Sequence, residues 1–432
     1  MKIWGKFRSL TIYFAVILLA SIAFVQNGSI INTNASSTYD AKIVNQSKRD
    51  NYIYASCPSN STKEVWVNYF ARDFNNHYVR VMDRIKTHAG TFAYIRYYGK
   101  YLGWIKVSCL KKTDINVIAA SALNQANLSG EVLLNYAGFS HQIVLARGYA
   151  SKAKRIDNQS KEKEIYPLAS LQKAMTGAMI EQLIASGKLS PETRLSEFYP
   201  EIKDSNNITI QRMLSMTSGI SSGELLPATK LSEDQAFSSM QSRVVSTGSS
   251  SFKYSDANYV LLAGIITKIT QKSYSKNLQL RILRPLQMHH TYIAGSSIGK
   301  EIIPESYNQT GYHSAARLSI DRETAIPGAG NVYATIQDFA NFEKGLNDGQ
   351  ILSKSQYRIL LSYGSFYSGG QYVDVPGIKH AHGAFGGDGF STDLFSDTDN
   401  YHLALVFLNA PLKDNLSPKQ FVSTMYNIAK YY

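Results

Sequence analysis

The stretch that decides the fold is Tyr166-Pro167-Leu168-Ala169-Ser170-Leu171-Gln172-Lys173-Ala174-Met175-Thr176-Gly177. It carries a serine three residues before a lysine, a spacing that places both side chains on one face of a helix. If Ser170 opens that helix, its oxygen also lies near the positive end of the helix dipole. Such a pair can activate an alcohol for acylation without a histidine. Because Ser-x-x-Lys also arises by chance on exposed helices, the pattern needs support from the rest of the chain.

Length and composition indicate a globular protein of more than one domain. The chain has 432 residues, 44% of them hydrophobic and 12% aromatic, which is ample for packed cores. Its formal net charge is +13. A surplus of this size either serves solubility alone or favours an anionic partner.

The N-terminus predicts export. Lys2, Lys6 and Arg8 precede an apolar run over residues 10–25, so residues 1–25 are typical of a signal peptide or of a single membrane anchor. Cleavage and retention in the membrane both remain open. Residues 26–44, rich in Asn, Ser and Thr, are predicted to form a flexible tether. An exported body makes nucleic acid an unexpected partner and favours anionic polymers outside the cell.

Residues 45–112 are predicted to form a small all-β module. Short alternating runs such as 78–81 and 92–95 are separated by turn residues. The stretch 97–105 resembles the Gly-Trp signature of SH3-like GW modules, which are associated with attachment to bacterial surfaces through teichoic acids. The module carries twelve Lys or Arg residues against four Asp or Glu residues. This resemblance implies binding to an anionic wall polymer through Arg96, Lys100 and Trp104; an inert spacer is the alternative.

The two cysteines, Cys57 and Cys109, both belong to this module. An exported protein meets conditions that permit a disulfide between them, whereas two buried free thiols are the alternative. Two cysteines so far apart, without histidines at metal-ligand spacing, do not predict a metal site.

A helical linker over residues 113–126 leads to a large domain over residues 127–432. Runs at 130–134 and 141–145 indicate a strand hairpin, and strands return in 381–410. The segment between them is mostly helical in pattern. We therefore expect an α/β (α+β) domain with an antiparallel sheet, completed by both ends of the domain, and a helical subdomain.

Two further motifs follow the Ser170 segment in order. They are Tyr254-Ser255-Asp256, with Asn258 two residues later, and His382-Gly383-Ala384. Together the three motifs resemble those of the serine β-lactamase and penicillin-binding-protein superfamily, in particular its class C-like branch. The resemblance covers roughly residues 127–430 and implies a β-lactamase/DD-peptidase-like fold. The Tyr-Ser-Asp form of the second motif is similar to that of Gram-positive teichoic-acid D-alanine esterases.

The resemblance implies a role for each motif residue. Ser170 would attack and carry the acyl group, while Lys173 and Tyr254 would share the proton transfers. The third motif would contribute His382, preferred over His380, and an oxyanion donor at Ala384 or Phe385 beside the backbone N–H of Ser170. Two second-motif residues would contact substrate or support catalysis: Asp256, which is alternatively a helix N-cap, and Asn258.

The sequence thus predicts an exported serine acyl hydrolase at the membrane face or wall of a Gram-positive-type bacterium. Its expected reaction is removal of D-alanyl esters from teichoic acids. The alternatives are a D-alanyl-D-alanine carboxypeptidase, low-affinity penicillin-binding protein or β-lactamase-like enzyme acting on peptidoglycan, and a wall-binding protein whose hydrolase domain has degenerated. No cofactor or metal is implied.

Overall fold

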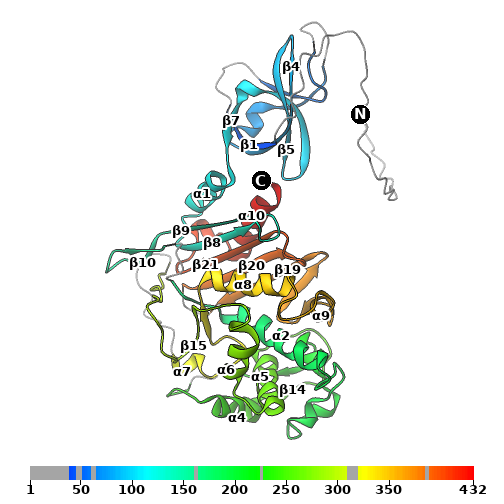
Figure 1. The fold of residues 1–432 in the computed structure, drawn as a ribbon, viewed down its shortest axis with the longest axis vertical. Helices are drawn as coiled ribbons and strands as arrows, with labels where there is room; N and C mark the ends of the chain where they lie inside the picture. The colour runs from blue at the N-terminus through cyan, green and yellow to red at the C-terminus, as the bar shows by residue number, and fades with distance from the viewer. Residues whose placement is uncertain are drawn as a thin grey trace, which may run out of the picture.

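The computed structural model describes residues 38–44, 51–59, 65–159, 164–223, 227–308, 320–384 and 389–432. A small β-sheet unit stands at one end of an elongated molecule, and a larger unit of sheet and helices fills the rest (Figure 1). Phe385 and the predicted signal or anchor over residues 1–25 lie outside the described residues. Among the described helices, none is long and apolar enough to cross a membrane.

The N-terminal unit is a seven-stranded antiparallel sheet in the order β3-β2-β6-β5-β4-β1-β7. Its strands are β1 (Tyr39–Ile43), β2 (Tyr52–Tyr54), β3 (Val67–Phe70), β4 (Tyr78–Thr87), β5 (Gly90–Tyr97), β6 (Lys100–Lys106) and β7 (Leu110–Thr113). Apolar side chains that alternate along the strands, such as Val79 and Val81 of β4, bury a separate small core. The likeness of this unit to SH3-like GW modules stays a prediction.

The structure corrects the predicted tether and decides between the two alternatives for the cysteines. Strand β1 lies within residues 26–44, the predicted tether, because it pairs with both β4 and β7 and buries Ala41 and Ile43. The sequence did not predict this short strand because the residues around it are mostly polar. Cys57 and Cys109 are free thiols rather than a disulfide. Burial raises the pKa of the Cys57 thiol to about 11, so it stays protonated and unreactive.

Helix α1 (Ile115–Gln125) leads from the small sheet to the large unit. Its N-terminus is capped by Asp114, whose carboxylate accepts hydrogen bonds from the backbone of Asn116 and Val117. The central sheet has the order β17-β18-β19-β20-β21-β8-β9. Its strands are β8 (Gly130–Asn135), β9 (Gln142–Arg147), β17 (Tyr367–Ser368), β18 (Gln371–Val375), β19 (Ile378–Ala384), β20 (Ser391–Asp397) and β21 (Leu403–Leu408).

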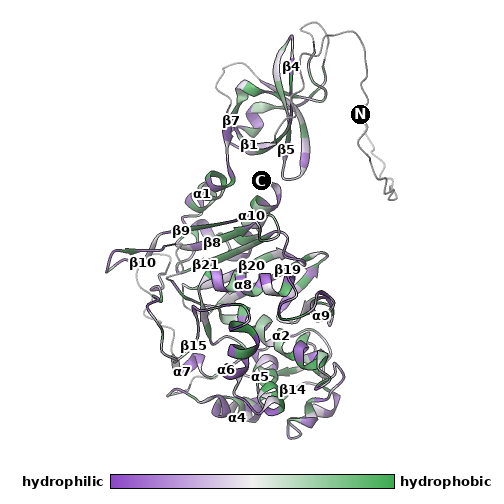
Figure 2. Ribbon diagram, viewed as in Figure 1, coloured by the Kyte–Doolittle hydropathy of each residue, from purple (hydrophilic) through white to green (hydrophobic). Residues whose placement is uncertain are grey.

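Strand β8, from the start of this unit, pairs with β21, from its end, along the full length of both. The predicted mixed α/β domain with a sheet completed by both ends is therefore confirmed. Side chains alternate between the two faces of β21. Ala404 and Val406 pack with α1 and with α10 (Pro418–Tyr431), whereas Leu405 and Phe407 face the core on the other side. Figure 2 shows the hydrophobic residues gathered in these central strands.

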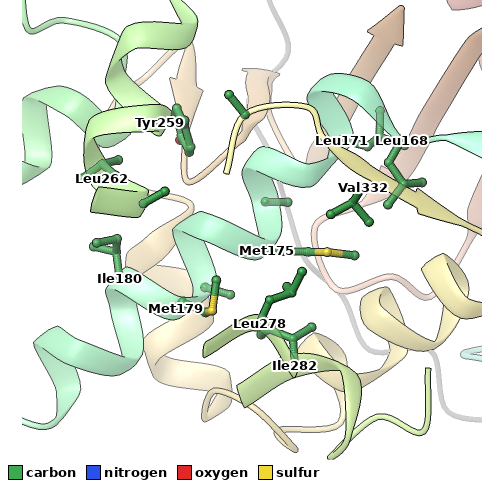
Figure 3. Packing of buried hydrophobic residues seen from close by; sticks show 14 of the residues in the cluster. Leu168, Leu171, Met175, Met179, Ile180, Tyr259, Leu262, Leu278, Ile282 and Val332 are labelled. Atoms are coloured by element: carbon green, nitrogen blue, oxygen red, sulfur yellow. The ribbon is translucent and has the colours of Figure 1, made fainter. Parts of the chain in front are cut away.

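On the opposite face of the sheet, α8 (Ile336–Asn347) packs against β8 and β21. The other helices pack on one another farther from the sheet (Figure 1), namely α2 (Gln172–Ala185), α3 (Ile210–Leu214), α4 (Glu233–Arg243), α5 (Asp256–Thr270), α6 (Tyr274–Leu278), α7 (Ile320–Glu323) and α9 (Lys354–Leu360). Short strands connect them, namely β10 (Tyr149–Ser151), β11 (Ile156–Asp157), β12 (Tyr166–Pro167), β13 (Ile220–Ser221), β14 (Val245–Ser246), β15 (Thr291–Ile293) and β16 (Val332–Ala334). Helix α2 is buried on nearly all sides, as expected for a helix without a polar face. In Figure 3, Met175 and Met179 of α2 lie among apolar side chains of neighbouring segments, including Leu278 and Ile282. This packing fixes the start of α2, where Ser170 lies.

Candidate active site

Ser170 lies in the short 3-10 turn Ala169–Leu171 that opens α2. The residue before it, Ala169, has a φ of +44°, which is uncommon for a residue with a side chain. Strain of this kind is found at functional sites, where the surrounding fold holds it in place. Here the fold does so by burying Leu168 and Leu171 on either side. Ser170 itself lines a cavity of about 540 Å³.

Lys173 lies one helical turn after Ser170, and its side chain is fully buried. Its Nζ is 2.8 Å from each of three oxygens: Oγ of Ser170, the carbonyl of Ala329 and Oδ1 of Asp256. Burial lowers the pKa of Lys173, but the charge of Asp256 and hydrogen bonds outweigh it, so the net pKa is raised. Lys173 is therefore an ammonium at neutral pH, which donates hydrogen bonds to Ser170 and Ala329 and forms an ion pair with Asp256.

Tyr254 meets Ser170 from the other side. Its hydroxyl is 2.8 Å from Oγ of Ser170, and Nζ of Lys173 is 5.1 Å from the centre of its ring. The ring is held by Tyr372, nearly parallel at an interplanar angle of 9°, and by Tyr367 at 88°. In the predicted trio, the side chains of Lys173 and Tyr254 thus converge on one atom, Oγ of Ser170.

Asp256 is the first residue of α5 and also lines the cavity. Its side chain is 43% exposed, so it pairs with Lys173 and still faces the space in front of Ser170. The alternative of an N-cap does not hold, because the N-cap of α5 is Ser255. A carboxylate in the first helical turn is nevertheless stabilised by the helix dipole.

Asn258 does not reach the cavity, which corrects the sequence-based assignment to substrate binding. Its side chain is fully buried and accepts a hydrogen bond of 2.5 Å from the hydroxyl of Ser218. Its amide nitrogen lies 3.3 Å from the sulfur of Met216 and 3.2 Å from the carbonyl of Ser255. Asn258 therefore ties α5 to the 216–218 segment. The physical reason is the helical turn, which directs Asn258 inward where Asp256 faces out.

The third motif forms the end of β19 beside Ser170. At Gly383 a β-carbon would lie only 2.4 Å from the carbonyl of Leu168 and 3.2 Å from the nitrogen of Ser170, so only glycine permits this approach. Ala384 lines the cavity. The end of β19 therefore lies directly against the backbone of Leu168 and Ser170, and the oxyanion donor at Ala384 or Phe385 stays a prediction.

The two candidate histidines lie differently. The side chain of His382 is 49% exposed, and its Nδ1 is 2.8 Å from the buried carboxylate of Asp393, a hydrogen bond that raises the pKa of His382. His382 is not among the residues that line the cavity, although it shares a face of β19 with Ala384. His380 is buried between the rings of Tyr372 and Phe395. Exposure thus distinguishes His382 from His380, and the preference for His382 as the third-motif histidine stays a prediction.

Sequence reasoning missed several cavity residues. Arg243, Lys253 and Arg322 line it, and the carbonyl of Ala329 holds Lys173. For Lys253, its place next to the second motif could have indicated that it lies near the site. Arg243 and Arg322 come from distant parts of the chain with no motif of their own.

The predicted wall-binding residues lie on two neighbouring strands of the small sheet. Arg96 is on β5, and Lys100 and Trp104 are on β6. The Trp104 ring packs on Tyr94 at 5.1 Å, which leaves it half-buried, while Lys100 is exposed. None of these three residues lines the cavity at Ser170, and their role in wall binding stays a prediction.

The sheet, its helices and the cluster around Ser170 define a serine hydrolase. Residues 64–409 match the family model described as Beta-lactamase, so the chain belongs to the beta-lactamase family. It is 25% identical to PbpX of Bacillus subtilis (strain 168), named as a penicillin-binding protein, over 325 residues that cover 74% of this chain and 80% of PbpX. It is 27% identical to the teichoic acid D-alanine hydrolase of Staphylococcus aureus over 253 residues, which cover 56% of this chain and 62% of the hydrolase.

Two solved structures share the fold. FmtA from Staphylococcus aureus matches with a TM-score of 0.62 at 23% identity, covering 74% of this chain and 89% of FmtA. A D-amino acid amidase from Ochrobactrum anthropi SV3 matches with a TM-score of 0.61 at 17% identity, covering 73% and 96% of the two chains. The expected β-lactamase-related fold and the class of serine hydrolase are therefore confirmed.

Proposed function

We propose that this protein is an exported esterase that removes D-alanyl groups from teichoic acids through an acyl-Ser170 intermediate. The observation that carries the proposal is Asp256, a carboxylate that faces the cavity beside the nucleophile. A D-alanyl ester has a free ammonium next to its carbonyl, and an ionised carboxylate is a suitable partner for it. Similarity to a teichoic acid D-alanine hydrolase supports the same substrate.

In the proposed reaction, Oγ of Ser170 attacks the ester carbonyl carbon while its proton moves to the oxygen of Tyr254, and the phenol passes its own proton on to the polyol oxygen. The backbone N–H groups of Ser170 and Ala384 stabilise the negative oxygen; Phe385 is the alternative second donor. The C–O bond to the polyol then breaks, and the polyol oxygen takes the proton from Tyr254. Water attacks the acyl-Ser170 ester by the same route in reverse, which releases D-alanine and restores the serine hydroxyl.

Lys173 acts in this scheme as a fixed positive charge. Its raised pKa keeps it protonated, so it directs one proton at Oγ of Ser170 and stabilises negative charge that develops on the reacting oxygens. Asp256 in turn maintains that charge. Ionisation of Asp256 therefore serves both the substrate ammonium and the catalytic lysine.

A peptidase acting on peptidoglycan stems is the second candidate, supported by the similarity to PbpX. A stem peptide presents a terminal carboxylate, which Asp256 would repel. A non-catalytic wall protein is the third candidate. The three short contacts on Ser170 and Lys173 argue against it, because degenerate sites have no requirement to keep such geometry.

The direct test is the acyl-enzyme itself. We expect mass spectrometry of the full chain, quenched during turnover, to find a D-alanyl adduct on Ser170 after incubation with D-alanylated teichoic acid. A stem peptide ending in D-alanyl-D-alanine should leave no adduct. An adduct formed only from the stem peptide would favour the peptidase.

Asp256→Asn should lower kcat/KM on a D-alanyl ester by about tenfold, the usual value of a partly exposed charge pair with substrate and lysine. Loss of the carboxylate also removes the main influence that raises the pKa of Lys173, so the alkaline fall in activity should move to lower pH. Acylation by penicillin, which carries a carboxylate, should rise or stay unchanged. A matched control is Asp234→Asn, an exposed acidic residue in the first turn of α4.

The N-terminal module is proposed to bind an anionic wall polymer. Lys100→Glu should weaken binding of the full chain to purified cell walls by several fold, and binding of the unmodified chain should fall steeply with salt, since exposed charges are screened within about 10 Å at 0.1 M. Lys188→Glu, an exposed lysine in the hydrolase domain, is the control. Salt-insensitive wall binding would contradict this role. If residues 1–25 are retained as an anchor, the membrane is a further partner.

A further inference from the structure

The cavity in front of Ser170 is charged differently from the catalytic cluster. Within the cluster, Lys173 and Asp256 compensate each other. The other ionised side chains that line the cavity are all basic: Arg243, Lys253 and Arg322. They come from three separate elements, the end of α4, the segment before α5, and α7. The described cavity wall thus combines one acid beside the nucleophile with three cations around it.

Arg243 is held in place by its backbone contacts. Its Nη1 donates to the carbonyl of Gly223 at 2.9 Å, and its Nε donates to that of Ser239 at 3.2 Å. Its Nη2 is shielded from solvent and has no hydrogen-bond partner among the described residues. The two hydrogen bonds of Arg243 are both to neutral carbonyls, so they position its guanidinium at the cavity wall without neutralising its charge.

Lys253 lies next to Tyr254 in the chain, and both line the cavity. Its Nζ is 3.3 Å from the hydroxyl of Ser221, a neutral group that leaves its charge uncompensated by that contact. In the proposed reaction Tyr254 delivers a proton to the departing polyol oxygen. A polyol that leaves past Tyr254 would therefore cross a cavity whose wall also carries the Lys253 cation.

We propose that Arg243, Lys253 and Arg322 form a phosphate subsite that binds the polyol phosphate chain on the leaving-group side of the scissile ester. The proposal rests on the function proposed above and adds how the polymer is recognised. Asp256 would take the ammonium of the acyl group, and the three cations would take phosphates of the chain. Guanidinium groups suit phosphate because they donate two parallel hydrogen bonds to it.

A carboxylate is the other anion that such cations bind, and a stem peptide carries one. Three cations from separate elements fit a ligand with repeated charges better than a ligand with one terminal charge. The shared chemistry is anion binding, and the two ligands can be distinguished by separate titrations. The acidic residue beside the nucleophile also disfavours the peptide carboxylate but not a phosphate farther along a chain.

Binding is best measured without turnover. In Ser170→Ala full-length protein, titration with dealanylated poly(glycerol phosphate) should give a dissociation constant that rises about threefold to tenfold when Lys253→Gln is added. Arg322→Gln should add a similar loss, and Lys253→Arg should restore most of the affinity. Lys188→Gln, which removes one exposed charge away from the cavity, should leave the affinity unchanged. Affinity for a D-alanyl-D-alanine peptide should change less than affinity for the polymer.

Kinetics of the chain with Ser170 intact separate this inference from the proposed function. Lys253→Gln should raise KM for D-alanylated polymer several fold more than KM for D-alanine methyl ester. If neither ester is cleaved, the proposed function fails, whereas the binding titration still tests the subsite. If Lys253→Gln and Arg322→Gln leave polymer affinity unchanged, or weaken only the peptide, the phosphate subsite is wrong.

Discussion

Ser170→Ala should reduce hydrolysis of a D-alanyl ester by at least about a thousandfold, because it removes the atom that forms the acyl-enzyme. The substitution keeps the backbone N–H of residue 170 and the start of α2. Lys173 loses one hydrogen-bond acceptor but retains Asp256 and the carbonyl of Ala329. The folded structure should therefore persist, with a change in stability of about 1 kcal/mol.

The measurement is the rate of D-alanine release together with the midpoint of thermal unfolding. Ser186→Ala, at the exposed end of the same helix, is the matched control and should keep the full rate. If Ser170→Ala lost both activity and folding, its activity alone would not identify the nucleophile. Ser170→Cys, whose side chain is of similar size, is therefore a second variant. Esterase rates near those of the unmodified chain in Ser170→Ala would refute the assigned nucleophile.

The catalytic trio could be predicted because each member lies in a short motif with a fixed local geometry. The spacing of Ser170 and Lys173 determines that they meet on one helix face. Tyr254 is 84 residues away from Ser170. Its approach to Ser170 was predicted from the resemblance to known motifs and not from local geometry. The central sheet was predictable because strand-like runs occur at both ends of the domain and one of them is continuously apolar.

Other parts of the site could not be read from the sequence. Helix α5 is buried on most sides, so its pattern did not indicate that Asp256 faces the cavity and Asn258 the interior. Arg243 and Arg322 reach the cavity only through the packing of α4 and α7, which no local pattern encodes. Strand β1 is stabilised by its partners β4 and β7, and its composition alone resembles a linker.

Two side chains contact the hydroxyl of Ser170, and the charge of Lys173 decides which accepts its proton. Burial lowers the pKa of Lys173, but Asp256 and hydrogen bonds raise it by more, so that the net pKa lies above its usual value of 10.5. At neutral pH the lysine thus has no lone pair to offer. The hydroxyl of Tyr254 donates to Oγ at 2.8 Å, and among the described residues it is the other group in contact with Oγ. It can take the serine proton if it passes its own proton on to the leaving group.

Tyr254→Phe should therefore lower kcat on a D-alanyl ester by about a hundredfold to ten-thousandfold, the usual contribution of a positioned acid and base. The phenyl ring keeps the stack on Tyr372, so KM and the unfolding midpoint should change little. Tyr401→Phe, which removes an exposed hydroxyl elsewhere, is the control. If Lys173 were instead the base, Tyr254→Phe would keep most of its activity while Lys173→Met lost it. If Lys173 is an ammonium, both variants should lose activity, because catalysis then needs the charge of Lys173 and the hydroxyl of Tyr254 together.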